Sequence, residues 1–257
     1  MKQYIVDAFT DKLFHGNQAA ICVLDTWLDD KVMMQIAKEN NFSETAFTVK
    51  TNDGYDLRWF TPGSEVKLCG HATLATSYVL FHFYEKTTDK IVFHTLSGDL
   101  FVKKEGDYIV MDFPVLQCNK TAINDLMIEA FKTAPSEAYI DDRLMLVYEN
   151  EQIIRDMKPD FDKVSLLHEH GVVVTAPGKE YDCVSRYFAP RLKVNEDPVT
   201  GSAHCMITPY WTQRLGKKQL HAYQASERGG ELLCELNKNR VVIKGKATLY
   251  SIGDLQI

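Results

Sequence analysis

The most constraining feature of this sequence is a repeat at about half the chain length. A pattern of arginine, an aromatic residue, phenylalanine, any residue and proline occurs at 58–62 and again at 186–190. Each copy leads through an acidic loop to a glycine, Gly70 or Gly201, and then to a stretch almost without charge. The offset is 128 residues between the two patterns and 131 between the two glycines, in a chain of 257 residues. This spacing indicates a duplicated unit, so we expect two similar domains.

The expected elements are mostly short strands, with a few helices. Runs of β-branched and aromatic residues, separated by Gly, Asn, Asp and Pro, predict many strands. Apolar residues at helical spacing predict surface helices at 29–40 and 122–132. The stretches 71–84 and 202–215 have no solvated face, so we expect each to form a helix that is enclosed by protein.

These elements predict an α+β fold with two pseudo-symmetric domains. Each domain is expected to be a curled, mostly antiparallel, barrel-like β-sheet around one central helix. We place the boundary near 113–118, where a strand gives way to an irregular stretch, so the domains cover 1–116 and 117–257. Whether the last strand returns to the N-terminal domain is left open.

Composition narrows the class of ligand. The formal charge of −6 arises from 29 basic and 35 acidic residues spread along the chain, which disfavours nucleic acid and anionic membranes and favours a small soluble molecule. The most apolar stretch, 71–84, is too short to cross a bilayer. The N-terminus lacks the apolar run of a secretory signal, so we expect a cytoplasmic protein.

The sequence contains no motif for a metal or a cofactor. Its six cysteines form no C-x-x-C pair, which favours free thiols over disulfides or a structural metal. There is no Walker loop, no Gly-x-Gly-x-x-Gly after a strand and no Gly-x-Ser-x-Gly. We therefore expect the protein to use neither a cofactor nor a metal.

The starts of the two enclosed helices indicate where a ligand binds. A helix leaves about four backbone N–H groups unmatched at its start, and the partial positive charge there favours an anion. Gly70 and Gly201 let the backbone approach a ligand in front of these helices. If the two domains face each other, both helix starts point into the cleft between them, where a small carboxylate- or phosphate-bearing molecule would fit.

Two carboxylates are candidates for chemistry. Glu44 lies between a predicted helix and a predicted strand, and the apolar neighbours Phe42 and Phe47 would raise its pKa toward neutrality, as a general acid/base requires. An ordinary exposed loop glutamate is the alternative. Asp197 lies four residues before Gly201, too far from the helix start for ordinary N-capping. Contact with a ligand is therefore favoured over capping for this residue.

Further candidates lie at the helix starts and in one turn. Thr200 and Ser202 are favoured N-cap residues, so capping and ligand contact are equal alternatives for them. Cys69 precedes the first helix, where a thiol can have a lowered pKa, but its counterpart is Thr200, so a two-thiol racemase lacks one base. His71 could cap the helix, contact an anion or transfer a proton. Asn17 lies in a predicted turn that could line the pocket.

Several motifs spread along the chain form a specific combination. They are Asp7-Ala-Phe with Gly16-Asn17-x-Ala-Ala, residues 41–47, residues 58–62 with 68–73, residues 185–190, residues 196–204 and residues 224–230. This combination resembles the PhzF-like (phenazine biosynthesis) family from the first strand to near the C-terminus. The resemblance implies the fold of diaminopimelate epimerase, a site between two pseudo-symmetric halves, and a homodimer.

The resemblance also implies an activity and roles for individual residues. The activity would be a cofactor-independent isomerisation in which Glu44, as general acid/base, moves a proton within one substrate molecule. By the same resemblance, His71, Asp197 and Ser202 would hold and polarise the substrate. The backbone around the two helix-start glycines would receive its anionic group.

Two residues depart from the family pattern, and two other functions stay open. Gln18 occupies a position where proline is common in the family. Cys69 occupies a position where the phenazine enzyme has no cysteine and where the epimerases use a cysteine as a base. A Cys69-dependent racemase or epimerase is therefore one alternative. A non-catalytic protein that binds an anionic metabolite is the other. The leading hypothesis is proton transfer within a small, carboxylate-bearing metabolite.

Overall fold

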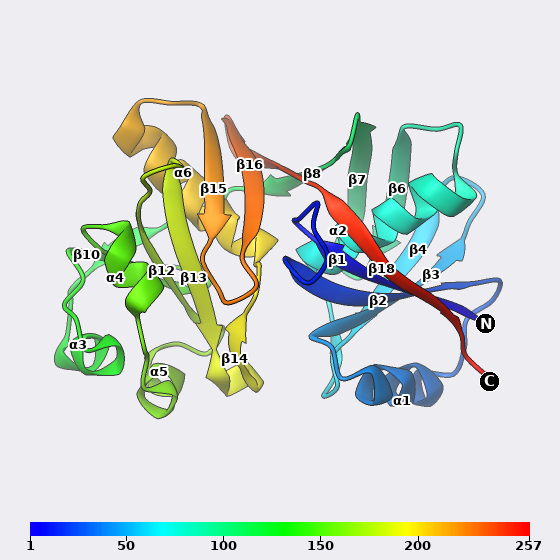
Figure 1. Ribbon diagram of the computed structural model, residues 1–257, viewed down its shortest axis with the longest axis horizontal. Coiled ribbons are helices and arrows are strands. Elements are labelled where there is room, and N and C mark those ends of the chain that lie inside the picture. The colour runs from blue at the N-terminus through cyan, green and yellow to red at the C-terminus, as the bar shows by residue number, and fades with distance from the viewer. The chain divides into compact units, whose positions relative to one another are not determined.

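The computed structural model describes the whole chain, residues 1–257, and divides it into two compact units (Figure 1). The first unit contains Met1–Asp112 and Lys244–Ile257, and the second unit contains Phe113–Ile243. No helix of the chain has the length and the apolar character needed to cross a membrane.

The first unit is built from its own strands and three helical segments. In chain order these are β1 (Lys2–Ala8), β2 (Asn17–Leu24), α1 (Asp30–Asn40), β3 (Glu44–Lys50), β4 (Tyr55–Phe60), β5 (Glu65–Val66), α2 (Gly70–Val79), the π-helical segment η1 (Leu80–Tyr84), β6 (Lys90–Thr95), β7 (Gly98–Glu105) and β8 (Tyr108–Pro114). The C-terminal strand β18 (Ala247–Asp254) also belongs to this unit.

The second unit has the same kinds of element and more short helices. In chain order these are β9 (Asn119–Thr121), α3 (Asp125–Phe131), β10 (Glu137–Ile140), β11 (Leu144–Val147), α4 (Glu151–Asp156), α5 (Phe161–Leu167), β12 (Val172–Pro177), β13 (Cys183–Ala189), the 3₁₀ segment η2 (Pro190–Leu192), β14 (Val194–Asp197), the 3₁₀ segment η3 (Gly201–Ala203), α6 (His204–Leu215), β15 (Gln219–Gln224), β16 (Gly230–Asn237) and β17 (Arg240–Gly245).

The two units repeat one pattern of strand pairing. In the first unit β1–β2 is antiparallel, β2–β3 parallel, β3–β4 and β4–β5 antiparallel, β4–β6 parallel and β6–β7 antiparallel. The second unit repeats this order in β10–β11, β11–β12, β12–β13, β13–β14, β13–β15 and β15–β16. Each sheet also gains one strand at the first strand of its repeat. In the first unit β18, from the C-terminal end of the chain, pairs with β1, and in the second unit β9, which follows the first repeat in the chain, pairs with β10. The predicted α+β fold with an internal duplication is confirmed.

Each curled sheet packs against one buried helix. In the first unit α2 packs against β1, β2, β3 and β18, and nine of its ten residues are buried. In the second unit α6 packs against β15 and β16, and its residues from His204 to Thr208 are buried. The prediction of complete enclosure was wrong at the ends of both helices, because 82–84 and 213–215 are exposed. The regular α-helix predicted for 71–84 also stops at Val79 and continues as a π-helical turn.

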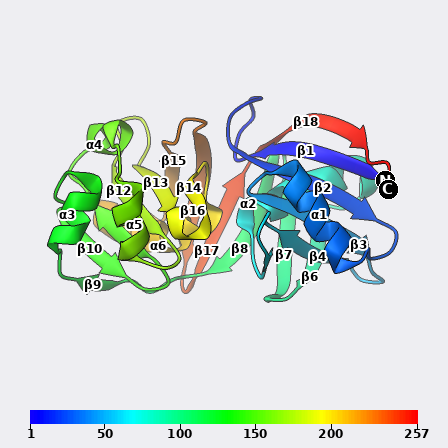
Figure 2. The same cartoon turned by 90° about the horizontal axis from the view of Figure 1, so that it is seen from below.

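The other helices lie against the sheets from outside (Figure 2). In the first unit α1 buries Met33, Ile36 and Ala37 against apolar side chains of β2, β3 and β4. In the second unit α3, α4 and α5 cover β10 to β13 through a core that includes Phe131 and Phe188. The surface helices predicted at 29–40 and 122–132 are confirmed as α1 and α3, whereas α4 and α5 were not predicted.

The repeated arginine pattern makes the same ion pair in both units. Arg58 donates from Nε and Nη2 to the two carboxylate oxygens of Glu65, at 2.7 and 2.9 Å, and its guanidinium lies 5.1 Å from the ring of Phe60. Arg186 donates in the same way to Glu196, at 2.6 and 2.8 Å. Bidentate arginine–carboxylate ion pairs are stronger than pairs with one hydrogen bond, and they fix the orientation of both side chains. Each pair therefore ties the strand that carries the arginine to the short strand, β5 or β14, that precedes the helix start.

Replacing Arg186 with methionine should destabilise the protein by about 3 kcal/mol, because it would leave Glu196 without its partner in a largely buried position. Only 12% of the Arg186 side chain is exposed, and it also donates to the carbonyls of Ile154 and Met157. Urea unfolding monitored by circular dichroism measures the change. The control is Arg191→Met, at an exposed position. Equal losses in the two variants would contradict a structural role for the pair.

A buried histidine in α6 links stability to pH. His204 is completely buried, and its Nδ1 donates to the carbonyl of Thr200 at 3.0 Å. Burial lowers the pKa of His204 from 6.5 to about 4. The unfolded chain therefore binds more protons than the folded chain between these two pH values, so stability is lost as the pH falls through this window.

The contribution of His204 can be isolated with His204→Asn, which keeps a donor for the Thr200 carbonyl and cannot be protonated. The wild type should lose about 2 kcal/mol more than this variant between pH 7 and pH 5, as a pKa of about 4 in the folded state requires. Urea unfolding at both pH values gives the difference. Parallel losses in the two proteins would show that His204 is not the responsible group.

Candidate functional site

Four predicted site residues of the first unit lie together at the start of α2. Glu44 is the first residue of β3, Asn17 is the first residue of β2, and the register places Glu44 opposite Ala19 of that strand. His71 is the second residue of α2, and Cys69 is its N-cap. The parallel pairing of β2 and β3 therefore brings Asn17 and Glu44 to the same end of the sheet, where the helix begins.

The imidazole of His71 lies at the centre of this group. Its Nε2 lies 3.2 Å from Oε2 of Glu44, in contact but not aligned as a hydrogen bond. Its Nδ1 lies 3.1 Å from Nδ2 of Asn17 and 3.5 Å from Sγ of Cys69. Burial lowers the pKa of His71, although the Glu44 carboxylate and the Gln18 backbone oppose this. The ring is therefore expected to be neutral at pH 7.

Asn17 helps to determine which nitrogen of that neutral ring carries the proton. The hydroxyl of Ser43 donates to Oδ1 of Asn17 at 3.5 Å, which leaves Nδ2, a donor, facing the ring of His71. A nitrogen that accepts this bond has no proton of its own. With Asn17 as the donor to Nδ1, we expect the proton on Nε2, the nitrogen that faces Glu44. Asn17, predicted to line a pocket, is itself buried.

Three of these residues could in principle ligate a metal ion. The ligand atoms of Glu44, Cys69 and His71 all lie within 4.8 Å of one another. However, the imidazole turns one nitrogen toward the thiol and the other toward the carboxylate. A single ion would reach all three ligands only if at least one side chain moved.

In the second unit, a buried glutamine holds the turn before the helix. The side chain of Gln224 accepts from the backbone N–H of Thr200 at 2.8 Å and donates to the carbonyl of Asp197 at 2.7 Å. The hydroxyl of Thr200 donates to the carboxylate of Asp197. Thr200 therefore does not cap the helix with its side chain, and it orients the Asp197 carboxylate instead. The role of Gln224 was missed, although it lies in one of the motifs quoted for the family resemblance.

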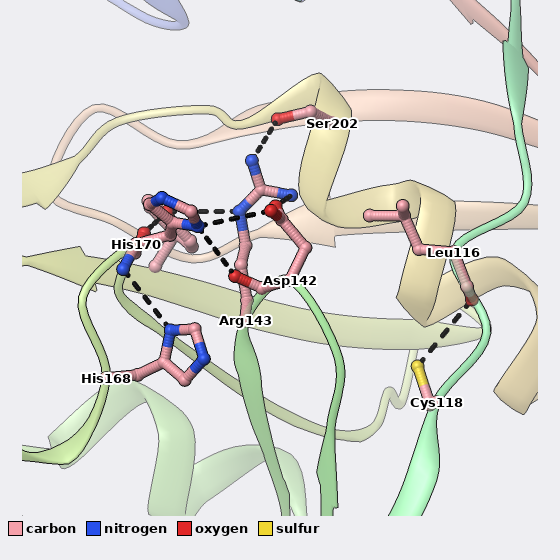
Figure 3. A network of polar contacts seen from close by, with 8 residues as sticks. Leu116, Cys118, Asp142, Arg143, His168, His170 and Ser202 are labelled. Carbon is pink, nitrogen blue, oxygen red and sulfur yellow. Dashed lines mark hydrogen bonds and ion pairs between the residues drawn. The ribbon is translucent and has the colours of Figure 1, made fainter.

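Ser202 belongs to a different group of contacts in the second unit (Figure 3). Its hydroxyl accepts from Nη2 of Arg143 at 3.2 Å and makes no cap bond to the helix. Arg143 lies directly before β11, and no sequence pattern singled it out. Gly70 and Gly201 are the first residues of α2 and η3, and both are buried. The structure thus groups the predicted residues unit by unit, and the expectation that both groups face one cleft stays a prediction.

Asn17→Leu should remove the preference for a proton on Nε2 of His71, because leucine donates nothing to Nδ1. Long-range ¹H–¹⁵N correlation spectra of the imidazole at pH 7.5 distinguish the two neutral tautomers. We expect the Nε2–H tautomer in the wild type and a mixture in the variant. Thr45→Val, a buried neighbour of the group, is the control. A wild-type spectrum of the Nδ1–H tautomer would contradict the role given to Asn17.

The chain matches known proteins along its whole length. Residues 6–253 match the PhzC-PhzF family, described as phenazine biosynthesis-like protein. A protein of Pseudomonas aeruginosa named an uncharacterized isomerase is 49% identical over 252 residues, which cover 98% of this chain and 97% of that protein. The crystal structure of a PhzF-family phenazine biosynthesis protein from Enterococcus faecalis is 47% identical with a TM-score of 0.98, covering 100% of this chain and 99% of the other.

A more distant structure shares the fold alone. A protein of P. aeruginosa named a predicted epimerase has a TM-score of 0.77 at 19% identity and covers 100% of this chain and 99% of its own. The fold is therefore epimerase-like, of the diaminopimelate epimerase type. The family and the names of its members support an isomerase-type function. By its sequence and its fold, the chain belongs to the PhzC-PhzF family of phenazine biosynthesis-like proteins.

Proposed function

We propose that this protein is a cofactor-independent isomerase that moves a proton within a small, carboxylate-bearing metabolite. The observation that carries the proposal is the contact of 3.2 Å between the carboxylate of Glu44 and Nε2 of the buried His71. The Glu44 side chain is 17% exposed, so it remains open to a ligand while most of it is shielded from water. A carboxylate in such surroundings can both take and return a proton.

The reaction needs one acid/base group and no net consumption of protons. The ionised Glu44 would remove a proton from one carbon of the substrate, and the electron pair would move into the adjacent unsaturated system. The protonated Glu44 would then return the same proton to a different carbon. Substrate and product are therefore isomers, and the enzyme ends in its starting state.

The other residues would bind the substrate and polarise it. In this proposal His71 is neutral and offers an N–H from Nε2, which stabilises negative charge without competing for the proton. Asp197, fixed by Thr200 and Gln224, and Ser202 would hold the substrate. The amides at Gly70 and Gly201 would receive an anionic group of the substrate.

A mechanism based on Cys69 is the competing function. Its thiol lies 3.5 Å from Nδ1 of His71, the contact that favours this alternative. However, burial favours the neutral form of His71, and a neutral ring does not stabilise a thiolate. In the second unit, the counterpart Thr200 is not a base and donates its hydroxyl to Asp197. The Glu44 mechanism is therefore preferred.

Two expectations complete the proposal. The family resemblance leads us to propose a homodimer, and the sequence leads us to propose a cytoplasmic location. Light scattering after size-exclusion chromatography would determine the mass of the assembly in solution.

Glu44→Gln should lower the rate of proton transfer at least about 100-fold, the contribution typical of general acid/base catalysis. The protein is incubated with a metabolite extract in deuterated water, and mass spectrometry detects metabolites that gain deuterium. Glu39→Gln, at an exposed position of α1, should behave as the wild type.

The same assay separates the two mechanisms. Cys69→Ala should retain most of the exchange if Glu44 is the acid/base and should lose it if the thiol is. Exchange that survives Glu44→Gln would remove this carboxylate from the mechanism. If the wild type causes no exchange in an extract that contains a metabolite it binds, the non-catalytic alternative is correct.

A further inference from the structure

The register of the two repeats identifies equivalent positions around the site. In the first unit Phe60 of the arginine pattern pairs with Thr45 of β3. In the second unit Phe188 of the same pattern pairs with Val172 of β12. Thr45 and Val172 are therefore equivalent. It follows that Glu44, one residue before Thr45, corresponds to residue 171 in the second unit.

Residue 171 is a glycine, and its surroundings leave no room for a carboxylate side chain. Gly171 has a φ of +107°, a conformation that residues with a side chain rarely adopt. A Cβ at this position would lie 2.7 Å from the carbonyl oxygen of Phe188 and 2.9 Å from the hydroxyl of Tyr187. The second unit therefore has no counterpart of the proposed acid/base.

An arginine occupies the neighbouring strand at this level. The backbone N–H of Leu144 donates to the carbonyl of Gly171, and Leu144 pairs with Val172, so Arg143 lies at the level of Gly171. Its guanidinium reaches Ser202, the residue after the helix-start glycine and hence the counterpart of His71 (Figure 3). Beside the start of the buried helix, the first unit therefore has an imidazole and a carboxylate. The second unit has a hydroxyl and a guanidinium, and the guanidinium comes from the neighbouring strand, where the first unit has Ala19.

The guanidinium of Arg143 is held firmly and keeps donors for a ligand. Only 16% of the side chain is exposed. Its Nε donates to the hydroxyl of Tyr187 at 3.2 Å, and the group lies 5.7 Å from the centre of that ring. With Nη2 bound to Ser202 and Nη1 lying 3.3 Å from Asp142, three of the five N–H groups of an arginine are engaged and two are left.

The one acid beside Arg143 does not neutralise it firmly. Asp142 is 42% exposed and also contacts Nδ1 of His170 at 3.1 Å, so it is shared between two partners (Figure 3). Because the Asp142 carboxylate is exposed, water screens its charge and the pair contributes little energy. A ligand carboxylate could therefore bind to the guanidinium without first displacing a strong buried pair.

We propose that Arg143 is a substrate-binding residue that selects a carboxylate, acting together with the hydroxyl of Ser202. A carboxylate matches the forked N–H groups of a guanidinium and, unlike a neutral amide, carries the opposite charge. This inference rests on the proposed function, in which the substrate bears a carboxylate. It adds that the charge partner of that carboxylate is the guanidinium of Arg143.

The test uses acetate as the probe and acetamide, which has nearly the same shape without the charge, as its reference. Both are titrated at constant ionic strength, and the Nε–H resonance of Arg143, identified by its loss in Arg143→Lys, reports binding. We expect the wild type to bind acetate at least about tenfold more tightly than acetamide, as for other charge-assisted hydrogen bonds. Arg143→Gln should abolish the preference, measured from backbone amide shifts around Ser202.

Two variants keep the result interpretable. Arg143→Lys retains the charge and loses the fork, so it should weaken acetate binding by about tenfold while leaving the spectrum folded. Arg214→Gln, which removes an arginine of the same unit with a 56% exposed side chain, should bind acetate as the wild type does. No acetate preference in the wild type, or the same preference in Arg143→Gln and Arg143→Lys as in the wild type, would overturn the inference.

The inference and the proposed function fail in different ways. Deuterium exchange that depends on Glu44, together with acetate binding that is indifferent to Arg143, would disprove the role of the arginine alone. Arg143-dependent acetate binding without any exchange would disprove the isomerase and leave an anion-binding protein. If both hold, Arg143→Gln should raise the KM of the exchanging metabolite at least about tenfold with a smaller change in kcat.

Discussion

The organisation of both units depends on one interaction that is made twice. An arginine on a central strand binds both oxygens of a glutamate that lies between it and the buried helix, in Arg58–Glu65 and in Arg186–Glu196. The pair holds the short strand β5 or β14, and the few residues between that strand and the helix start have few conformations once both ends are fixed. The residues that follow, at 69–71 and at 200–202, are therefore held in defined positions. Side chains that bind a ligand or take part in a reaction must be held in a defined geometry by the surrounding structure.

On this common frame, the two units carry different chemistry. The first has Glu44 and a neutral imidazole, and the second has Gly171 in place of the carboxylate. Two opposed bases are what a racemase requires, since one removes a proton and the other delivers a proton to the opposite face. A single base can remove and return the same proton, which shifts it within one molecule. The loss of symmetry between the repeats therefore agrees with the proposed single-base proton shift better than with a two-base racemase.

Much of the fold was predictable because the sequence repeats its own signals. The spacing of the arginine pattern and the glycines indicated the duplication, and β-branched runs indicated most strands, including β3, β4 and β12. The sequence predicts a turn at 16–20, whereas the structure begins β2 at Asn17, because polar Asn17 and Gln18 and two small alanines do not show a strand pattern. The helices α4 and α5 have six and seven residues, too few to show a period, and side chains of Asn150 and Asp160 cap them. Both buried helices emerge at their ends. Residues 82–84 lack Asp, Glu, Lys and Arg and so do not indicate exposure, whereas Arg214 is a charged residue at the exposed end of α6.

By itself, the sequence determined the α+β class, the duplication, the family resemblance and the names of the candidate residues, since each of these is written in local patterns and their spacing. The tertiary structure decided which of them touch. Only the parallel register of β2 and β3 brings Asn17 and Glu44 to His71, 27 or more residues away in the chain. Only the tertiary fold brings Arg143, which directly precedes β11, to Ser202 in η3, 59 residues away in the chain. Such contacts depend on strand pairing between distant segments, and no local propensity encodes which segments will pair.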